Sequence, residues 1–470
     1  MNDTILDICH HLPSPLRSAA ASLRGLYLRS WRYGRESDRL VQEARERERW
    51  SNERWRTWQQ EQLAMVLSRA ATRVPYYREQ WVERRRKGDH ASWGVLENWP
   101  TLEKEIVRQN PNAFLADDCN VRKMFHEHTS GTTGKPLDTW WSRETVQMFY
   151  ALSEARWRLW YGVSKQDAWA VLGGQLVTSV AQRKPPFWVW NAALNQLYMS
   201  SYHLAPDLVP NYLDAIRKHR VKYIFGYCSS LYAIAAEVIR QRVTDLRMEV
   251  AITNAEPLLP HQRQTIAKAF QCPVRETYGL SEIVTSGGEC GHGVLHLWPE
   301  LGYVEILQGN QPLGNGSIGE LVCTSLLNKD MPLIRYRVGD RASLETTALP
   351  CKCGRNLPVL AGLDGRIDDV LYTSDGRRVG RLDPVFKTQL PLSEAQIIQE
   401  TLKSVRVRYV SSPGFTQETA RLIKKRLQDR MGAVEVILDS VTEIPRGPNG
   451  KFQSVICRIP PEDRKALEGS

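Results

Sequence analysis

The sequence at residues 128–136 reads HTSGTTGKP and combines glycines, hydroxyl side chains and one lysine in a short span. Glycines let backbone N–H groups turn toward a ligand without a Cβ clash, while hydroxyls and an ammonium supply further donors to phosphate oxygens. A Walker-type loop continues Gly-Lys with Ser or Thr for magnesium, whereas here Pro136 follows. The segment therefore predicts a polyphosphate-binding loop outside the Walker type, with a plain surface turn as the alternative.

Four further motifs follow this loop in a fixed order. They are TYGLSE at 277–282, YRVGD at 336–340, GRIDD at 365–369 and PNGK at 448–451. Together with the loop, the ordered set resembles the adenylate-forming enzymes, and within them the phenylacetate-CoA ligase-like proteins, which include relatives that accompany capsule and exopolysaccharide synthesis. The resemblance covers roughly residues 70 to 460 and rests on the order of the motifs rather than on any one of them.

The resemblance implies an α/β fold: a large N-terminal domain with parallel sheets and a β subdomain, followed by a small α+β C-terminal lid domain. We expect a helical N-terminal region at residues 1–95, the adenylate-forming large domain at 96–365 and the lid at 366–470. Asp368 lies where related enzymes have the hinge between the large domain and the lid. Tryptophans at helical spacing in the first region more often dock a helix onto the body than bind a ligand.

The residue pattern of the middle region also indicates a layered α/β domain. Short apolar runs such as 168–172 and 223–226 alternate with helical stretches such as 231–241, which is typical of parallel sheets covered on both faces. Residues 302–307 and 319–324 read instead as paired antiparallel strands of a smaller β subdomain.

The C-terminal part reads as a strand, a helix and a strand. These are residues 405–410, an amphipathic helix at 417–431 and residues 434–438. This pattern is sufficient for a small α+β domain.

The resemblance implies three catalytic residues. Lys451 would bring its ammonium to the α-phosphate and offset charge in the transition state. Glu282 would bind Mg²⁺, a hard cation that takes carboxylate and phosphate oxygens. Ser281 stands where the family usually has Thr, which keeps the hydroxyl. The structural alternatives are a solvated lysine in a tail loop and a surface carboxylate.

A larger set is implied to hold ATP. Tyr278 would lie against the adenine ring, with residues 254–257 as the opposite wall, unless it is a core tyrosine. Asp340 offers two acceptor oxygens to the ribose hydroxyls, although Val338 replaces the family's usual Thr. The implied nucleotide-binding residues are Ser130, Gly131, Thr132, Thr133, Gly134, Lys135, Glu256, Pro257, Tyr278, Gly279, Asp340, Arg366 and Arg377.

The acid substrate is implied to lie between Phe225, Gly226 and Tyr227 on one side and the turn after Tyr278 on the other. An aromatic lining there suits a benzoate-like or phenylacetate-like acid, and it equally suits simple packing. The identity of the acid stays open.

A second group of residues has the chemistry of a metal site. Thiolates and an imidazole from separate loops can complete a tetrahedral zinc site, and similar ligase-like proteins hold a structural metal at these places. Our choice of ligands is Cys290, His296, Cys351 and Cys353, with His292 as the competing ligand. Reduced thiols without metal are the alternative in a cytosolic chain.

Composition and charge exclude several classes of protein. The net charge of +11 invites a nucleic-acid partner, but basic residues alternate with acids, as in RERER at 45–49, which is typical of a solvated helix face. No nucleic-acid-binding signature accompanies the charge, so we expect no nucleic acid and at most a weak attraction to anionic ligands or a membrane surface. No apolar run approaches the roughly 20 residues of a membrane span. We expect a cytoplasmic protein, and the oligomeric state cannot be inferred.

The expected activity is ATP- and Mg²⁺-dependent activation of a carboxylic acid to an acyl adenylate, followed by transfer to coenzyme A. One alternative is transfer to an amine or hydroxyl in polysaccharide or natural-product synthesis. Another is an inactive nucleotide-binding scaffold, against which the presence of Lys451, Glu282 and Asp340 argues.

Overall fold

The computed structural model describes most of the chain. The described residues are 12–128, 137–179, 181–255, 258, 260–345, 351–364, 371–375, 377–379, 382–386, 390–445, 455–460 and 462–463.

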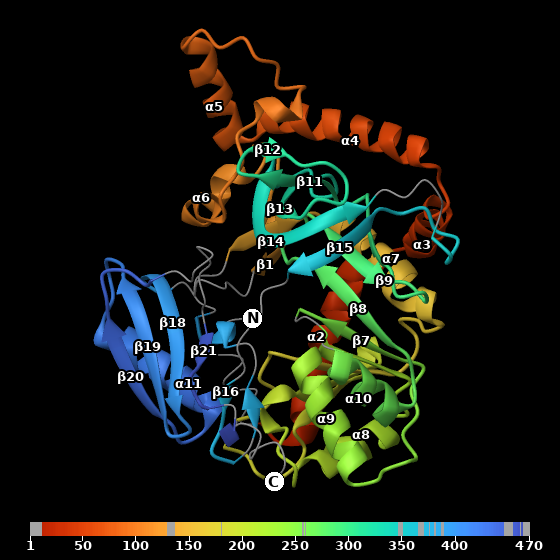
Figure 1. The fold of residues 1–470 in the computed structure, drawn as a ribbon, viewed down its shortest axis with the longest axis vertical. Coiled ribbons are helices and arrows are strands. Elements are labelled where there is room, and N and C mark those ends of the chain that lie inside the picture. Colours follow the sequence, from red (N-terminus) through yellow and green to blue (C-terminus); the bar gives the residue numbers. More distant parts are fainter. Residues whose placement is uncertain are drawn as a thin grey trace.

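The described part of the N-terminal region is mainly helical (Figure 1). Its helices begin at residues suited to a first turn: Pro15 and Pro75 lie at helix starts, and the Ser51 side chain accepts from the Arg54 N–H. Trp31 and Trp81 are buried in clusters with residues of the body and so dock their helices onto it, whereas Trp55 is buried against Trp50 and Trp58. The helices are α2 (Ser14–Arg32), α3 (Ser37–Arg47), α4 (Asn52–Arg73) and α5 (Pro75–Arg86).

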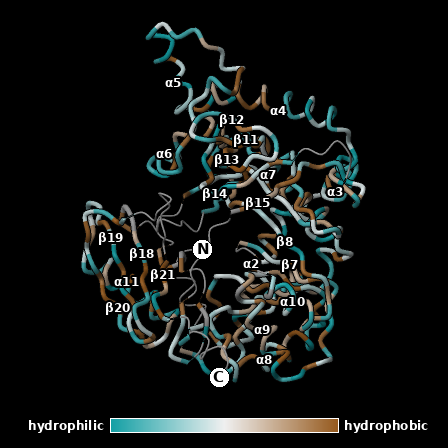
Figure 2. Tube along the Cα trace, in the orientation of Figure 1, coloured by the Kyte–Doolittle hydropathy of each residue, from teal (hydrophilic) through white to brown (hydrophobic). Residues whose placement is uncertain are grey.

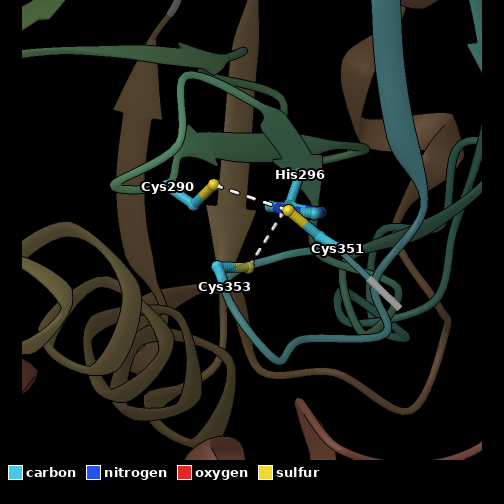
Figure 3. A group of neighbouring side chains, drawn as sticks. All are labelled: Cys290, His296, Cys351 and Cys353. Atoms are coloured by element: carbon cyan, nitrogen blue, oxygen red, sulfur yellow. Dashed lines mark hydrogen bonds between the residues drawn. The ribbon is translucent and has the colours of Figure 1, made fainter. Parts of the chain in front are cut away.

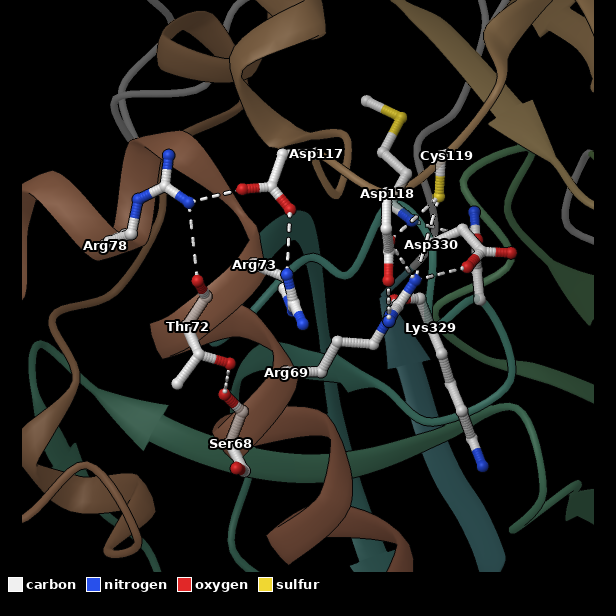
Figure 4. A network of polar contacts seen from close by, with 12 residues as sticks. Ser68, Arg69, Thr72, Arg73, Arg78, Asp117, Asp118, Cys119, Lys329 and Asp330 are labelled. Atoms are coloured by element: carbon white, nitrogen blue, oxygen red, sulfur yellow. Dashed lines mark hydrogen bonds and ion pairs between the residues drawn. The ribbon is translucent and has the colours of Figure 1, made fainter.

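Helix α4 is fixed to the body by Arg69, whose guanidinium lies between two acidic loops (Figure 4). Its Nη2 lies 2.7 Å from Asp118 Oδ1 and 2.9 Å from Asp330 Oδ1. Its Nε donates to the Lys329 carbonyl at 2.9 Å. One side chain thereby joins three segments that are far apart in the sequence.

Among the described residues, one mixed sheet of 13 strands runs through the large domain in the order β12-β11-β13-β14-β15-β10-β9-β8-β7-β6-β3-β5-β4. Strands β5, β3, β6, β7 and β8 are parallel, and the pairing becomes antiparallel from β8 to β9 onward. The expected β subdomain is therefore a continuation of the same sheet. The strands are β3 (Trp169–Gly173), β4 (Trp188–Asn191), β5 (Gln196–Ser200), β6 (Tyr223–Tyr227), β7 (Val250–Asn254), β8 (Val274–Gly279), β9 (Ser286–Glu289), β10 (Leu295–Leu297), β11 (Gly302–Gln308), β12 (Gln311–Pro312), β13 (Gly319–Ser325), β14 (Tyr336–Glu345) and β15 (Val359–Asp364).

Both faces of the parallel strands are covered, which explains their nearly continuous apolar sequences. Ile224 of β6 belongs to the same buried core as α9 and α10, whereas the next residue, Phe225, faces Trp157 on the other side with ring centroids 6.0 Å apart. Figure 2 shows hydrophobic residues along the strands and hydrophilic ones on the outer turns of the helices. The remaining helices of the large domain are α6 (Lys104–Gln109), α7 (Arg143–Ser153), α8 (Val209–Lys218), α9 (Cys228–Arg240) and α10 (Pro260–Phe270).

The C-terminal part folds around a smaller sheet of order β20-β19-β18-β21. Helix α11 (Gln417–Met431) has the predicted bounds, and Thr416 caps it through the Thr419 N–H. The sequence pattern missed β18 (Leu392–Thr401), which pairs with both β19 and β21. The other strands are β16 (Leu371–Tyr372), β17 (Arg378–Val379), β19 (Ser404–Ser411), β20 (Glu435–Ser440) and β21 (Val455–Cys457).

Candidate functional site

The carboxyl ends of β6, β7 and β8 bring three of the sequence motifs to one edge of the sheet. Tyr227 lies opposite Asn254 in the register, and the Thr277 hydroxyl donates to the Thr253 carbonyl at 2.8 Å. In open parallel sheets this edge is where ligands bind. The Tyr227 and Tyr278 motifs are therefore neighbours, although about fifty residues separate them in the sequence.

Tyr278 and Asp340 are in direct contact at this edge. The Tyr278 hydroxyl donates to Asp340 Oδ2 at 2.8 Å, and both side chains are buried. Asp340 lies in a stretch of β14 where the register with β13 shifts, and Gly339 there has a φ of 83°. A left-handed glycine accommodates such a bulge without a Cβ clash. Asp340 keeps the alternation of β14, so its carboxylate lies on the buried face that contacts Tyr278.

Glu282 is a fully buried carboxylate with a cation beside it. Lys104 Nζ and the Tyr336 hydroxyl each lie 2.8 Å from Glu282 Oε1. Burial alone would raise the pKa of Glu282, but the Lys104 ammonium and the Tyr336 hydroxyl outweigh it, so the pKa lies below its ordinary value. Glu282 is therefore an ionised carboxylate, which is the state that a magnesium ligand requires.

Lys104 is a residue of this site that sequence reasoning missed. It is the first residue of α6, and a parallel bridge between Leu102 and Tyr336 holds that helix start against β14. Lys104 and Glu282 are 178 residues apart in the sequence, so no local spacing predicts their contact. Because the ammonium contacts Oε1, a divalent cation at Glu282 would have to share the carboxylate with Lys104 or displace it.

Trp157 is a second missed residue, and it lies beside the expected substrate pocket. Its indole N–H donates to the Gly287 carbonyl at 2.9 Å. Its ring lies beside the Phe225 ring and close to Gly279. The neighbouring strand position 226 must be glycine, because a Cβ there would clash with the Leu172 carbonyl. Trp157 belongs to a π-helical turn, Glu154–Arg158, a feature found frequently at functional sites. The turn after α7 carried no sequence signal for this role.

The Arg377 side chain is buried. Its Nε lies 3.0 Å from both carboxylate oxygens of Asp375, and its Nη1 donates to the Tyr202 carbonyl of the large domain. In this arrangement the guanidinium joins the C-terminal part to the large domain.

Several sequence-predicted residues lie outside the described residues. They are Ser130, Gly131, Thr132, Thr133, Gly134, Lys135, Glu256, Pro257, Arg366, Asp368 and Lys451. Strands β1 (Phe125–His128) and β2 (Asp138–Trp141) pair antiparallel on either side of the glycine-rich segment, and His128 is opposite Asp138. Ser281 is described and exposed, in the turn after β8.

Cys290, His296, Cys351 and Cys353 form a compact cluster (Figure 3). Their ligand atoms all lie within 4.8 Å of one another. Cys290 Sγ is 3.9 Å from Cys351 Sγ, and Cys353 Sγ is 3.5 Å from His296 Nε2. A tetrahedral zinc ion separates its sulfur and nitrogen ligands by roughly 3.3–3.8 Å, given bonds of about 2.0–2.3 Å. The donor set and its spacing therefore fit zinc.

The surroundings of the cluster also suit a metal. His296 Nδ1 lies 3.2 Å from the Leu357 carbonyl, which fixes the ring and leaves Nε2 toward the cysteines. Burial lowers the pKa of His296 and so favours the neutral imidazole that binds metals. The competing ligand, His292, has an exposed side chain and only its backbone N–H approaches Cys290 Sγ, at 3.4 Å.

Comparison with known proteins gives a consistent set of relatives. Residues 371–458 match the family model described as the CapK C-terminal domain. The chain is 27% identical over 371 residues to Protein CapK of Staphylococcus aureus, an alignment that covers 77% of this chain and 80% of CapK. It is 25% identical over 450 residues to the phenylacetate-coenzyme A ligase of Thermus thermophilus, covering 86% and 96%.

Solved structures show the same fold at lower identity. A crystal structure of 2-hydroxyisobutyryl-CoA ligase with 2-HIB-AMP and CoA in the thioesterification state aligns with a TM-score of 0.53 and 19% identity, covering 90% of this chain and 94% of that chain. The same ligase in the postadenylation state aligns with a TM-score of 0.51 and 18% identity, with the same coverage of both chains. In the part of the chain that the structure describes, no helix is both long and hydrophobic enough to cross a bilayer.

Proposed function

We propose that this chain, a phenylacetate-CoA ligase-like homologue of CapK with the fold of the adenylate-forming enzymes, activates a carboxylic acid with ATP and transfers the acyl group to coenzyme A. The observation that carries the proposal is the contact between Tyr278 and Asp340 at the carboxyl edge of the sheet. It joins two motifs that the resemblance assigns to one nucleotide. A buried aspartate there offers acceptor oxygens to ribose hydroxyls beside an aromatic ring.

In the first step, a carboxylate oxygen of the acid attacks the α-phosphorus of ATP. A carboxyl O–P bond forms, the bond from the α-phosphorus to the bridging oxygen breaks, and pyrophosphate leaves with that oxygen. The chain's task in such a displacement is to position the reactants and to neutralise charge. We assign Asp340 to the ribose, Tyr278 to the adenine, and Lys451 to the α-phosphate.

Glu282 is the residue that would hold Mg²⁺, and its ionised state and burial fit that role. The ion, when bound, supplies charge neutralisation at the phosphates. Lys104 already places one positive charge at this carboxylate.

In the second step, the sulfur of coenzyme A attacks the acyl carbonyl, the thiol proton is lost, and AMP leaves with the oxygen that joined it to the acyl group. An amine or hydroxyl acceptor is a second candidate, because the match to CapK leaves the acceptor open. Phe225 and Trp157 give the acid site an aromatic side, which suits an aryl acid.

The test is to incubate the protein with ATP, Mg²⁺ and a panel of aryl and aliphatic acids and to measure AMP with and without coenzyme A. We expect acid-dependent AMP whose release rises severalfold when the acceptor is present. AMP formation that responds to an amine or sugar but not to coenzyme A would select the second candidate. An absence of acid-dependent AMP with every acceptor would reject the activity.

We also propose that Cys290, His296, Cys351 and Cys353 hold a structural zinc ion. All four coordination positions would come from the protein, which is typical of structural rather than catalytic zinc. The ion would join the turn after β9 to the loop before β15.

A further inference from the structure

A small cavity lies at the edge of the sheet opposite the Tyr278–Asp340 site. Its volume is about 120 Å³. It adjoins Trp169, the first residue of β3, whereas the proposed adenylation site is at the carboxyl ends of the parallel strands. The polar side chains that line it include Arg29, Arg32, Arg158, Lys165, Gln166 and Asn195.

Four of these side chains are cations that come from two separate segments. Arg29 and Arg32 belong to the last turn of α2, and Arg158 and Lys165 follow α7. The carboxylates in contact with them are Glu154, 3.3 Å from Arg158 Nη1, and Asp38, 3.4 Å from Lys165 Nζ. The Asp38 side chain is 98% exposed, so water screens its charge strongly.

The helix dipole at the end of α2 compensates for only about half an elementary charge. The cavity therefore keeps an excess of positive charge.

Arg32 has one buried nitrogen that the described residues do not satisfy. Its guanidinium lies 4.4 Å from the centre of the Tyr150 ring, and its Nε is buried without a hydrogen-bond partner among the described residues. Buried polar atoms in folded proteins nearly always have a partner, and a bound ion or water is one explanation for an exception. The Arg158 Nε donates to the Tyr223 hydroxyl at 2.8 Å. This hydrogen bond fixes the Arg158 side chain in the wall of the cavity.

We propose that this cavity binds a tetrahedral oxyanion, either inorganic phosphate or the terminal phosphoryl group of a small ligand. Guanidinium groups match the geometry of phosphate oxygens, and Lys165 adds a point charge. A water molecule takes roughly 30 Å³, so the cavity has room for about four waters or one such anion. It is too small for a nucleotide, because ligand pockets for larger molecules begin at about 300 Å³.

The experiment is isothermal titration calorimetry of the full-length protein with sodium phosphate. It is repeated with sodium chloride at matched ionic strength. The segment at 128–136 is a second candidate for phosphate binding. The titrated protein therefore carries Lys135→Ala, which weakens binding at that segment. We expect saturable binding of phosphate in that background and none of chloride. Glycerol 3-phosphate as titrant shows whether a phosphomonoester also fits, which separates free phosphate from a phosphoryl ligand.

Arg32→Gln and Lys165→Gln are the test variants, and Arg45→Gln is the matched control because it removes one exposed charge from α3. We expect the affinity for phosphate to fall about tenfold or more in each test variant and to stay unchanged in the control. Binding of equal strength in all three variants would overturn the proposal, as would a response to phosphate no larger than that to chloride. Acid-dependent AMP formation is measured separately. A failure of the proposed ligase activity can therefore be distinguished from a failure of phosphate binding at the cavity.

Discussion

The Tyr278 hydroxyl donates a 2.8 Å hydrogen bond to Oδ2 of Asp340, joining strands β8 and β14 across 62 residues of sequence. The two strands are not neighbours in the sheet, since β9, β10 and β15 lie between them. Asp340 keeps the alternation of β14, in which Tyr336, Val338 and Ala342 are also buried, and the register shift between β13 and β14 falls beside it.

Tyr278→Phe should destabilise the protein, because it removes the hydroxyl and leaves a buried carboxylate short of one donor. We expect the free energy of unfolding to fall by about 1–3 kcal/mol. Urea denaturation measures this, with Tyr303→Phe as the control, since the Tyr303 hydroxyl has no hydrogen-bond partner among the described residues. Equal losses in both variants would show that the Tyr278–Asp340 bond contributes nothing specific.

Lys104→Met should leave Glu282 as a buried carboxylate without its cation. Removing one partner of a buried ion pair costs about 3–5 kcal/mol, and the partial exposure of Lys104 puts the expected loss near the lower end. The control is Lys222→Met, which breaks the exposed ion pair with Asp167 and should cost much less, because water screens that pair.

The loss caused by Lys104→Met should depend on pH. In the wild type the pKa of Glu282 is lowered, so its stabilising contribution is present above the ordinary pKa and is lost as the pH falls through the lowered value. In the variant, burial raises that pKa, and protonation relieves the unpaired charge as the pH falls. The difference in unfolding free energy between the two proteins should shrink from pH 7.5 to pH 5. A constant difference over this range would contradict the charge pairing.

Protein purified without a histidine tag should contain about one equivalent of zinc, and Cys351→Ser should lose most of it. Cys457→Ser is the matched control, because Cys457 lies on β21 and outside the cluster. Elemental analysis gives the metal content, and a melting temperature lowered by a chelator in the wild type but not in Cys351→Ser shows the coupling to folding. Less than about half an equivalent in the wild type would argue against the site.

Local sequence patterns predicted those parts of the fold that local interactions determine. Helix α11 has the predicted bounds because Thr416 caps it and Gly432 ends it. The antiparallel pair β11 and β13 was also predicted, from residues 302–307 and 319–324. Strand β18 was missed because its sequence mixes Ser, Glu and Gln with apolar residues, and its burial comes from pairing with β19 and β21.

The candidate site divides in the same way. Tyr278, Glu282 and Asp340 were found because each sits in a short motif. Lys104 and Trp157 were missed because their relevance arises only from contacts across more than 100 residues, which no spacing in the sequence encodes. The cysteine cluster was found from its ligand chemistry, since Cys and His in nearby loops carry a signal even at long separation.

Exchange of labelled pyrophosphate into ATP, measured with the acid that gives the most AMP, tests acid activation most directly. We expect exchange that requires both the acid and Mg²⁺, is abolished by Lys451→Ala, and is lowered at least about tenfold by Asp340→Ala through lost ribose hydrogen bonds. Circular dichroism confirms that both variants are folded. Wild-type exchange in folded Lys451→Ala protein, or exchange that does not depend on the acid, would contradict the proposed activity.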